Sequence, residues 1–406
     1  MLSVRRLTLS KPTMRRYNFC EHIKGKMMVY DVVIIGGGVI GCSTAFHLAE
    51  KGQRSVVVIE RDFLASGSTG RCGGGIRAQW STEGNIRLAQ ASISEFERFK
   101  ELTGQDIQFR QGGYLLPAYT DETARQFKEN VALQKRYGVP VEIITPEEAA
   151  RITPAVQIEQ MRLATFCPTD GVANPFLVVK GYSEAAKKMG VTFLLREEVV
   201  AFETEGDRIS AVLTGNGTKI GCGAVLNAAG PWAGLIAQKA SVNLPLQPFR
   251  HQILVTEPTE IFHQPMVIDL DHNLYFCQQE EGGIVAGQTD EDEPPSFNIR
   301  NSHRFVVDIA RKLTFHNPRL GALCVVRQWA GLYTMTPDAQ PILGQVGERR
   351  NFFCACGFSG HGFMLSPAVG QVMAQLLMGE APTLPIDDYS VERFRAGKIT
   401  REKWVV

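Results

Sequence analysis

The first patterned region of the chain combines continuous apolar runs with one amphipathic segment. Residues 30–35 (YDVVII) form an apolar run that ends in glycines, and residues 55–60 (SVVVIE) form a second run. Between them, residues 39–50 carry apolar side chains at helical spacing. Short apolar runs next to glycines favour buried strands, so this order predicts a strand, a tight turn, a helix and a second strand, which is a βαβ unit.

Helical spacing of apolar residues recurs along the rest of the chain. It predicts helices at about 83–103, 121–137, 176–189, 302–316 and 365–378. Residues 191–229 instead predict a meander of strands, because Asp207 and the GNG sequence at 215–217 supply turns. Two further regions, about 105–168 and about 241–330, are rich in strand-like runs. They predict a mostly antiparallel sheet that one long helix interrupts.

The turn after the first apolar run reads GGGVIG at 36–41, which is G-x-G-x-x-G between a strand and a helix. In this context Gly36 permits the turn, Gly38 lets the backbone approach a pyrophosphate, and Gly41 allows the helix to pack closely. Glu60 ends the second strand 24 residues after Gly36, where a carboxylate accepts hydrogen bonds from ribose hydroxyls and repels a 2′-phosphate. The segment therefore predicts a dinucleotide site that disfavours NADP.

A second glycine-rich stretch, ASGSTGRCGGGIR, follows at 65–77. A domain that binds only NAD does not need such a loop, whereas FAD extends its ribityl chain and isoalloxazine ring along backbone N–H groups in this region. Thirteen of the 39 glycines lie in only three windows, 36–41, 67–75 and 357–370. We therefore expect FAD, and an NAD-dependent dehydrogenase is the weaker hypothesis.

These patterns predict an α/β fold, α+β overall, with two interleaved domains. A Rossmann-like FAD-binding domain of the glutathione-reductase type is expected at 29–104, 169–240 and 331–397, and a mostly antiparallel β-sheet substrate domain at 105–168 and 241–330. Residues 1–28 are expected to be a basic leader, disordered or a mis-assigned start. Residues 1–27 carry seven basic residues, one acid and no continuous apolar run, and an organellar targeting segment is the alternative.

The overall composition narrows the class of protein. A net charge of +1 provides no long-range field for collecting nucleic acid, and no run approaches 18 apolar residues, so neither nucleic-acid binding nor a membrane span is expected. The nine cysteines include no C-x-x-C pair and no zinc-type spacing. We expect reduced thiols, a cytoplasmic location and no metal site.

Five motifs together resemble a known family. They are GGGVIG at 36–41, GSTGRCGGGIR at 67–77, NAAGPWAG at 227–234, WAGLYTMTPDAQPILG at 329–344 and CGFSGHGFMLSPAVG at 356–370. Over residues 29 to about 397 the chain resembles the D-amino-acid-oxidase-like FAD oxidoreductases, within them the sarcosine oxidase β, proline dehydrogenase β and glycine oxidase group. Residues 381–394 (APTLPIDDYSVERF) are similar to proline dehydrogenase β subunits.

The resemblance implies how FAD is held. The backbone at Val199 or Val200 is expected to meet the adenine, and residues 228–230 to close over the nucleotide. The whole set of expected cofactor-binding residues is Gly36, Gly38, Val39, Ile40, Gly41, Glu60, Arg61, Ser66, Ser68, Thr69, Gly73, Gly74, Gly75, Val199, Ala229, Gly230, Trp232, Gly331, Gly357, Ser359, Gly360, His361, Gly362, Phe363 and Met364.

Amine oxidation by a flavin requires a held substrate carboxylate and donors that accommodate negative charge at the flavin N1/O2 edge. The loop around His361 precedes a predicted helix, whose positive end suits that edge. Arg77 and Arg327 are the candidates for gripping the carboxylate, since a guanidinium can form two bonds to it. Tyr275 and Tyr333 are candidates for the cavity wall, and packing is an equal alternative for both.

Departures from relatives refine these expectations. Monomeric sarcosine oxidases attach FAD to a cysteine where this chain has Gly331, and they carry a lysine where Met364 stands, so non-covalent FAD is expected and direct reaction with oxygen is in doubt. The flavin-linking histidine of heterotetrameric sarcosine oxidase β is missing near 174–175, and Tyr333 replaces the arginine of glycine oxidase. These differences favour the proline dehydrogenase β type, which passes electrons to partner subunits.

The function expected is FAD-dependent oxidation of the C–N bond of a small amino acid or N-methyl amino acid, of the sarcosine, proline or glycine type, by hydride transfer to the flavin N5. The alternative is a non-catalytic FAD-binding assembly or scaffold flavoprotein. Residues 74–89 (GGIRAQWSTEGNIRLA) resemble an assembly factor of a respiratory complex, and the basic leader would fit import into an organelle. A partner flavoprotein or electron-transfer subunit is expected in the first case.

Overall fold

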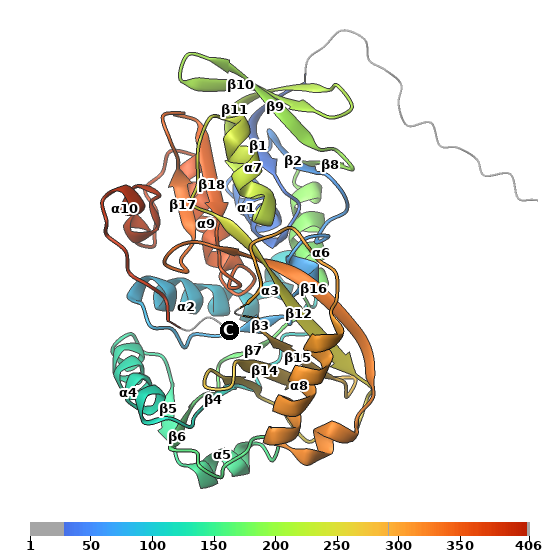
Figure 1. The fold of residues 1–406 in the computed structure, drawn as a ribbon. Coiled ribbons are helices and arrows are strands. Elements are labelled where there is room, and N and C mark those ends of the chain that lie inside the picture. Colours follow the sequence, from blue (N-terminus) through green and yellow to red (C-terminus); the bar gives the residue numbers. More distant parts are fainter. Residues whose placement is uncertain (1–27, 291, 404–406) are drawn as a thin grey trace, which may run out of the picture.

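Two large sheets with helices packed on them make up the molecule, and one lies above the other in Figure 1. The computed structural model describes residues 28–290 and 292–403, so the predicted leader lies outside the described residues except for Met28. Helices and strands both contribute substantially, which confirms the predicted mixed α/β class.

The first sheet has the order β17-β18-β11-β1-β2-β8, and β10 joins β9 to β11. The pairs from β18 to β8 are parallel, while β17, β10 and β9 pair antiparallel to their neighbours. Its strands are β1 (Met28–Ile35), β2 (Val56–Glu60), β8 (Thr192–Leu195), β9 (Val199–Glu205), β10 (Arg208–Thr214), β11 (Lys219–Asn227), β17 (Ile342–Gln345) and β18 (Phe352–Cys356).

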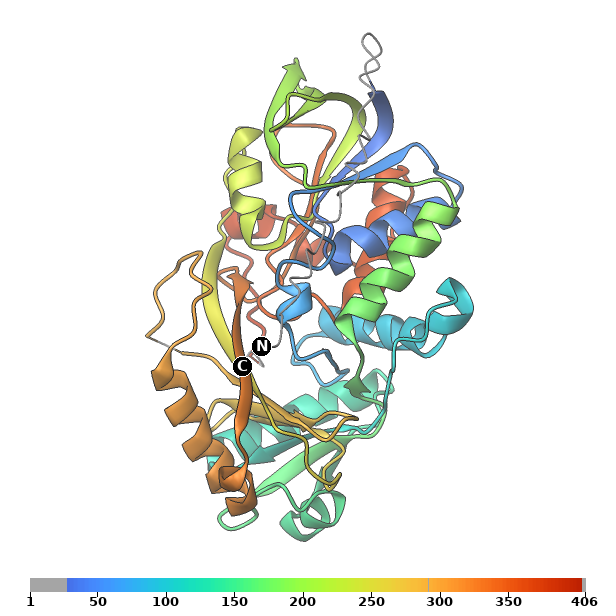
Figure 2. The ribbon, with the colours of Figure 1, turned by 90° about the vertical axis from the view of Figure 1, so that its right-hand side faces the viewer.

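Helices cover both faces of this sheet, which explains the unbroken apolar runs of β1 and β2. Alternate side chains point to opposite faces: Ile34 and Val58 belong to the core shared with α1 (Val39–Glu50), whereas Val33 and Val57 pack with α7 (Ala233–Lys239). Helices α6 (Pro175–Lys188) and α9 (Ser366–Leu377) pack against α1, as Figure 2 shows.

The second sheet has the order β16-β12-β15-β14-β13-β4-β6-β5 and is antiparallel except between β13 and β4. Helix α8 (His303–His316) packs on one face, and α4 (Asp121–Arg136) packs near β4 and β6. The strands are β4 (Tyr114–Ala118), β5 (Glu142–Ile144), β6 (Leu163–Cys167), β12 (Gln247–Thr256), β13 (Met266–Asp269), β14 (Leu274–Gln278), β15 (Ile284–Gln288) and β16 (Val325–Met335).

The remaining elements complete the described chain. They are the two-stranded ribbon β3 (Gly75–Ile76) and β7 (Gly171–Val172), the helices α2 (Glu83–Glu97), α3 (Phe99–Thr103), α5 (Pro146–Ile152) and α10 (Glu392–Arg395), and the 3-10 turns η1 (Thr69–Arg71), η2 (Gly230–Trp232), η3 (Pro318–Ala322) and η4 (Asp387–Tyr389).

Two local expectations need correction. The helix predicted at 83–103 is interrupted at Arg98, which ends α2 and precedes α3. The predicted meander at 191–229 is wrong at its first strand, because β8 pairs in parallel with β2 and only β9, β10 and β11 form a meander. The physical reason is the preceding helix α6, since a crossover helix returns the chain in the direction of β2.

The division into two domains stays a prediction. The predicted boundary between residues 330 and 331 falls within β16, which pairs with β12 from Val325 to Met335. This long strand leads from the second sheet to the edge of the first, as the orange ribbon in Figure 1 shows. The first sheet otherwise draws its strands from 29–104, 169–240 and 331–397, and the second from 105–168 and 241–330.

Candidate active site

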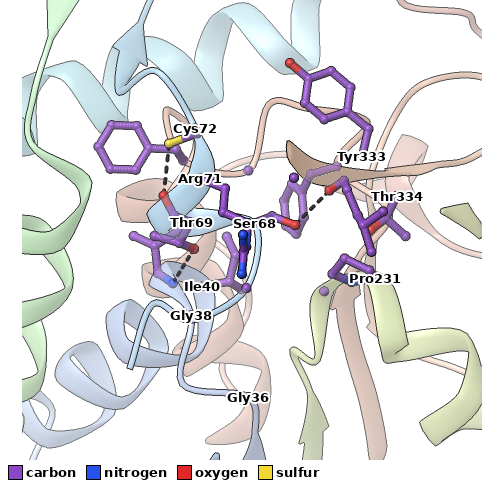
Figure 3. Close-up of a pocket in the computed structure, with 18 of the residues that line it drawn as sticks. Gly36, Gly38, Ile40, Ser68, Thr69, Arg71, Cys72, Pro231, Tyr333 and Thr334 are labelled. Atoms are coloured by element: carbon purple, nitrogen blue, oxygen red, sulfur yellow. Dashed lines mark hydrogen bonds between the residues drawn. The ribbon is translucent and has the colours of Figure 1, made fainter. Parts of the chain in front are cut away.

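One long cavity of about 650 Å³ runs from the carboxyl end of β1 to the inner face of the second sheet. A volume of this size falls in the range of ligand pockets, roughly 300–1,000 Å³. Gly36, Gly38 and Glu60 lie at one end, and Tyr114 and Tyr275 lie at the other. Figure 3 shows part of the lining.

The first end is built by the glycine turn between β1 and α1. Gly36 has φ +113°, and a Cβ there would lie 2.4 Å from the carbonyl oxygen of Ala228. A Cβ on Gly41 would lie 2.0 Å from the carbonyl oxygen of Gly36, so this third glycine allows the helix to start against the turn. Gly41 itself does not line the cavity. The turn thus brings backbone and the start of α1 to the wall, as a pyrophosphate requires.

Glu60 holds this turn in place. Its Oε2 accepts a hydrogen bond from the backbone N–H of Gly37 at 2.7 Å, and its Oε1 accepts one from Asp62 at 2.9 Å. The residue is only 8% exposed and it lines the cavity. Its carboxylate is therefore fixed at the cavity wall beside the glycine turn, and its expected hydrogen bonds to ribose hydroxyls stay a prediction.

The second glycine-rich loop fastens the first sheet to the second. The Thr69 hydroxyl accepts a hydrogen bond from Val39 N, at the start of α1, at 3.1 Å. Ser68 Oγ donates to the carbonyl of Leu332 at 2.7 Å (Figure 3). Arg71 Nη1 donates to the carbonyl of Ala330 at 3.2 Å, and both acceptors lie on β16. The loop therefore forms a continuous wall between the two ends of the cavity.

A third segment, residues 357–364, closes the cavity opposite this loop. Gly360 has φ +94°, and a Cβ there would lie 2.5 Å from Cε2 of Tyr333. Ser359 N donates to the carbonyl of Thr334 at 3.0 Å, and α9 begins two residues after Met364. The residues fit FAD, since three glycine-rich backbone segments line one cavity, and a Cβ at Gly36, Gly74 or Gly360 would collide with neighbouring protein atoms.

Arg77 supplies a positive charge to the far end of the cavity. The residue is 2% exposed and lines the cavity. Its Nη2 lies 3.4 Å from Nε2 of His361, and its guanidinium lies 4.5 Å from the ring centre of Trp80. Burial lowers the pKa of Arg77 from its ordinary value, but a guanidinium remains protonated in proteins. Because the guanidinium of Arg77 is shielded from water, its electrostatic attraction for an anion is strong.

The rings that the second sheet contributes to this end of the cavity are electrically neutral. His251 is stacked between Tyr275 and Tyr333, with ring centres 5.7 Å and 4.2 Å apart. Burial lowers the pKa of His251 to about 3, and burial raises the pKa of Tyr114, Tyr275 and Tyr333 above the ordinary value. At neutral pH this end therefore presents a neutral imidazole and protonated phenols beside the arginine.

The structure places most of the predicted residues on one cavity. Apart from Gly41, every residue expected to bind the cofactor contributes to its lining, as do Arg77, Tyr275, Tyr333 and His361. Arg327 does not: it is exposed on β16 and lies over Trp329 at 5.5 Å. The expected role of Arg327 in the site is therefore not supported by its position. Whether the lining residues contact FAD or substrate stays a prediction.

Sequence reasoning missed several lining residues. Among them are Cys72 in the glycine-rich loop and Tyr114, His251, Met266 and Ile268 from the second sheet. The four residues of the second sheet lie on β4, β12 and β13, and nothing in their local sequence distinguishes them from core positions. The pairing of these strands alone brings them together.

The fold and the cavity together define the class of protein. The family model described as FAD dependent oxidoreductase (DAO) matches residues 31–376. This chain belongs to that family, and it is an FAD-dependent oxidoreductase.

Known proteins are similar over almost the whole chain. FAD-dependent oxidoreductase domain-containing protein 1 of Xenopus laevis is 31% identical over 425 residues, covering 93% of this chain and 85% of that protein. Sarcosine oxidase subunit beta of Arthrobacter sp is 29% identical, covering 92% and 93%. The crystal structure of L-proline dehydrogenase from P. horikoshii has a TM-score of 0.88 at 37% identity, covering 93% of this chain and 100% of that chain.

Three further features concern the described residues only. None of their helices is long and apolar enough to cross a membrane. They contain no group of three or more His, Cys, Asp or Glu side chains that could hold a metal ion. Their eight cysteines are free thiols.

Proposed function

We propose that this enzyme oxidises the C–N bond of a small amino acid or N-methyl amino acid. The observation that carries the proposal is the buried Arg77 at the end of the cavity away from Gly36 and Glu60. The names of related proteins, sarcosine oxidase subunit beta and L-proline dehydrogenase, support a substrate of the sarcosine, proline or glycine type.

The charges of the lining match a carboxylate-bearing amine. The carboxylates of the lining, Glu60, Glu197 and Glu198, come from β2 and the connection before β9, so they belong to the dinucleotide end. At the other end Arg77 can hold a carboxylate through two charge-assisted hydrogen bonds. The neutral rings of Tyr275 and His251 offer no charge to stabilise an ammonium ion, so they favour the uncharged amine that the reaction needs.

Bound FAD supplies a hydride acceptor, the flavin N5, for the C–H bond next to the substrate nitrogen. The chain's own residues orient and enclose the substrate. Arg77 fixes the carboxylate, and the stacked rings of Tyr275, His251 and Tyr333 limit the volume beside it. The backbone of 359–364 and the start of α9 provide positive potential at the cavity wall next to His361, where negative charge is stabilised.

We also propose that the electrons leave through a partner subunit, in the cytoplasm. The relative from Arthrobacter is named as a subunit, and Met364 stands where monomeric relatives carry a lysine. The free thiols of the described residues agree with a reducing compartment. Affinity purification from the native cell tests the partner, and fractionation of the same cells tests the location.

Anaerobic mixing of the FAD-loaded protein with sarcosine, proline, glycine and other D- and L-amino acids tests the main proposal. We expect at least one of them to bleach the flavin absorbance. If none does, the amine oxidation is refuted and the assembly-flavoprotein hypothesis gains support. Turnover of the amino acid that bleaches the flavin is then measured with oxygen and with an artificial electron acceptor, which distinguishes an oxidase from a dehydrogenase. We expect faster turnover with the artificial acceptor.

A further inference from the structure

The last described residues return from α10 to the centre of the molecule (Figure 1), where Glu402 lies beside the start of α2. Residues 395–403 are exposed with one exception, Glu402, which is 1% exposed. A fully buried carboxylate in an otherwise exposed tail is unusual, because charged residues are almost never buried unless they are paired or hydrogen-bonded. We name residues 400–403 the C-terminal clasp.

The backbone of the C-terminal clasp is fixed to the turn that follows β16. Gln340 Nε2 donates to the carbonyl of Thr400 at 2.6 Å, and Glu402 N donates to the carbonyl of Asp338 at 3.0 Å. Asp338 is itself held by Arg393, whose Nε and Nη2 donate to its carboxylate at 2.7 Å and 3.0 Å. The backbone of the C-terminal clasp is therefore held by Gln340 and Asp338, and Asp338 is itself fixed by Arg393.

The Glu402 side chain connects the C-terminal clasp to the start of α2. Its Oε1 accepts hydrogen bonds from Ser81 N at 3.2 Å and Ser81 Oγ at 2.6 Å. Its Oε2 accepts from Thr82 Oγ1 at 3.1 Å and from Asn85 Nδ2 at 3.0 Å. Four donors thus converge on one carboxylate, at the N-terminal end of a helix, where negative charge is favourable.

Two of the residues that Glu402 holds, Ser81 and Thr82, follow Arg77 closely in the sequence. Residues 77–82 (RAQWST), here named the Arg77 segment, are short and internally bonded, since Trp80 Nε1 donates to the carbonyl of Arg77 at 3.0 Å. The Trp80 ring also meets the His361 ring edge-on at 4.5 Å. Asp170 accepts from Ala78 N at 2.7 Å, so a carboxylate fixes each end of the segment.

We propose that Glu402 is a positioning residue for substrate binding. It fixes the C-terminal end of the Arg77 segment, and it thereby orients the guanidinium of Arg77 toward the substrate carboxylate. This inference rests on the proposed function, in which Arg77 binds that carboxylate. It assigns a role in the active site to a residue 325 positions away in sequence, at the end of the chain. Small displacements of an orienting group are costly, because bidentate bonds require close alignment.

Glu402→Gln tests the proposal with the least change of shape. The amide nitrogen replaces one carboxylate oxygen and would face an N–H donor in either orientation, that of Ser81 or that of Asn85, so the segment loses at least one anchor. We expect the KM for the amino-acid substrate, and the Kd for acetate measured by the change in flavin absorbance, to rise about tenfold. The limiting rate of anaerobic flavin reduction at saturating substrate should stay within threefold. The control Glu392→Gln alters an exposed carboxylate of the same region and should leave both constants unchanged.

A compensating substitution provides the rescue. In Glu402→Gln combined with Asn85→Asp, the new amide donates to the new carboxylate, and Tyr389, which donates to Asn85 Oδ1 at 2.8 Å, keeps an acceptor. We expect the KM and the acetate Kd to return to within threefold of the wild-type values. A merely structural role of Glu402 would instead lower the thermal midpoint and the bound FAD without a selective change in these two constants.

The outcomes separate the two proposals. The positioning role is overturned if Glu402→Gln holds FAD normally and binds acetate and substrate as wild type does, while Arg77→Met weakens both. If Arg77→Met also leaves both constants unchanged, Arg77 does not bind the substrate carboxylate and the positioning role of Glu402 fails with it. The proposed oxidation itself fails only if no amino acid reduces the flavin. Should Glu402→Gln not fold, Ser81→Ala decides, because it removes one donor to Oε1. We expect a twofold to threefold rise in KM, and an unchanged KM overturns the role.

Discussion

Replacing Arg77 by methionine should separate binding from stability. Methionine fills a similar volume but carries no charge and no N–H donors. If Arg77 holds the substrate carboxylate, the substitution removes two charge-assisted hydrogen bonds from a residue that is 2% exposed. If Arg77 is only structural, the same substitution should destabilise the fold and leave substrate affinity unchanged.

The magnitude of both effects follows from the surroundings of Arg77. A hydrogen bond to a charged group contributes roughly 1.5–3 kcal/mol, so losing two costs about 3–6 kcal/mol, which lowers kcat/KM by roughly 10²- to 10⁴-fold. The contact with Trp80 contributes on the order of 1 kcal/mol to stability, and Asp170 and Glu402 attract the buried guanidinium, whereas its burial costs several kcal/mol. We therefore expect the free energy of unfolding to change less than the free energy of substrate binding.

Two measurements check this prediction. Anaerobic flavin reduction at increasing amino-acid concentration gives the binding constant and the limiting rate, and urea unfolding followed by tryptophan fluorescence gives the stability. The matched control is Arg327→Met, because that arginine is exposed and lies outside the cavity. A large loss of stability in Arg77→Met with an affinity equal to that of the control would refute the reasoning.

Further predictions concern groups away from the substrate. Burial alone would lower the pKa of His47, but hydrogen bonds to two glutamates raise it to about 9 from the ordinary 6.5. Its contribution, on the order of 3 kcal/mol, is therefore complete below pH 6.5 and lost as the pH rises through 9, and urea unfolding across that range should show the loss, whereas His47→Gln should not. Gly36→Ala should abolish FAD retention on gel filtration, because its Cβ would meet the backbone of Ala228 at 2.4 Å; normal retention would contradict the close approach. Arg393→Met should destabilise the fold by about 3–5 kcal/mol in urea, since it leaves the carboxylate of Asp338 buried without its ion pair; an unchanged midpoint would show that the pair contributes little.

Local patterns were sufficient for the elements that carry the dinucleotide end. The apolar run before Gly36 and the acid at 60 predicted β1, α1 and β2 within a few residues, because tight turns and buried parallel strands impose strong demands on neighbouring residues. The same patterns misplaced β8, whose partner is chosen by the crossover of α6 and not by its own sequence.

The substrate end could be predicted only in part. Arg77 was expected because it follows the second glycine-rich loop directly, and Arg327 was expected with equal weight from its place before WAG. The structure separates them, since it buries Arg77 against the cavity and leaves Arg327 exposed on an edge strand. His251 was not expected at all, because one histidine in a strand is indistinguishable from a core residue until its neighbours are known.

The sequence by itself determined the family, the cofactor and the backbone segments that line the cavity, because glycine spacing and apolar periodicity express short-range steric rules. The tertiary structure decided which side chains share the far end of that cavity. His251 and Tyr275 meet there only because β12 and β14 pair with opposite edges of β15, and Glu402 reaches Ser81 across 321 positions of sequence. Such contacts arise from long-range strand pairing and burial, which change the charge and position of a residue without leaving a local pattern.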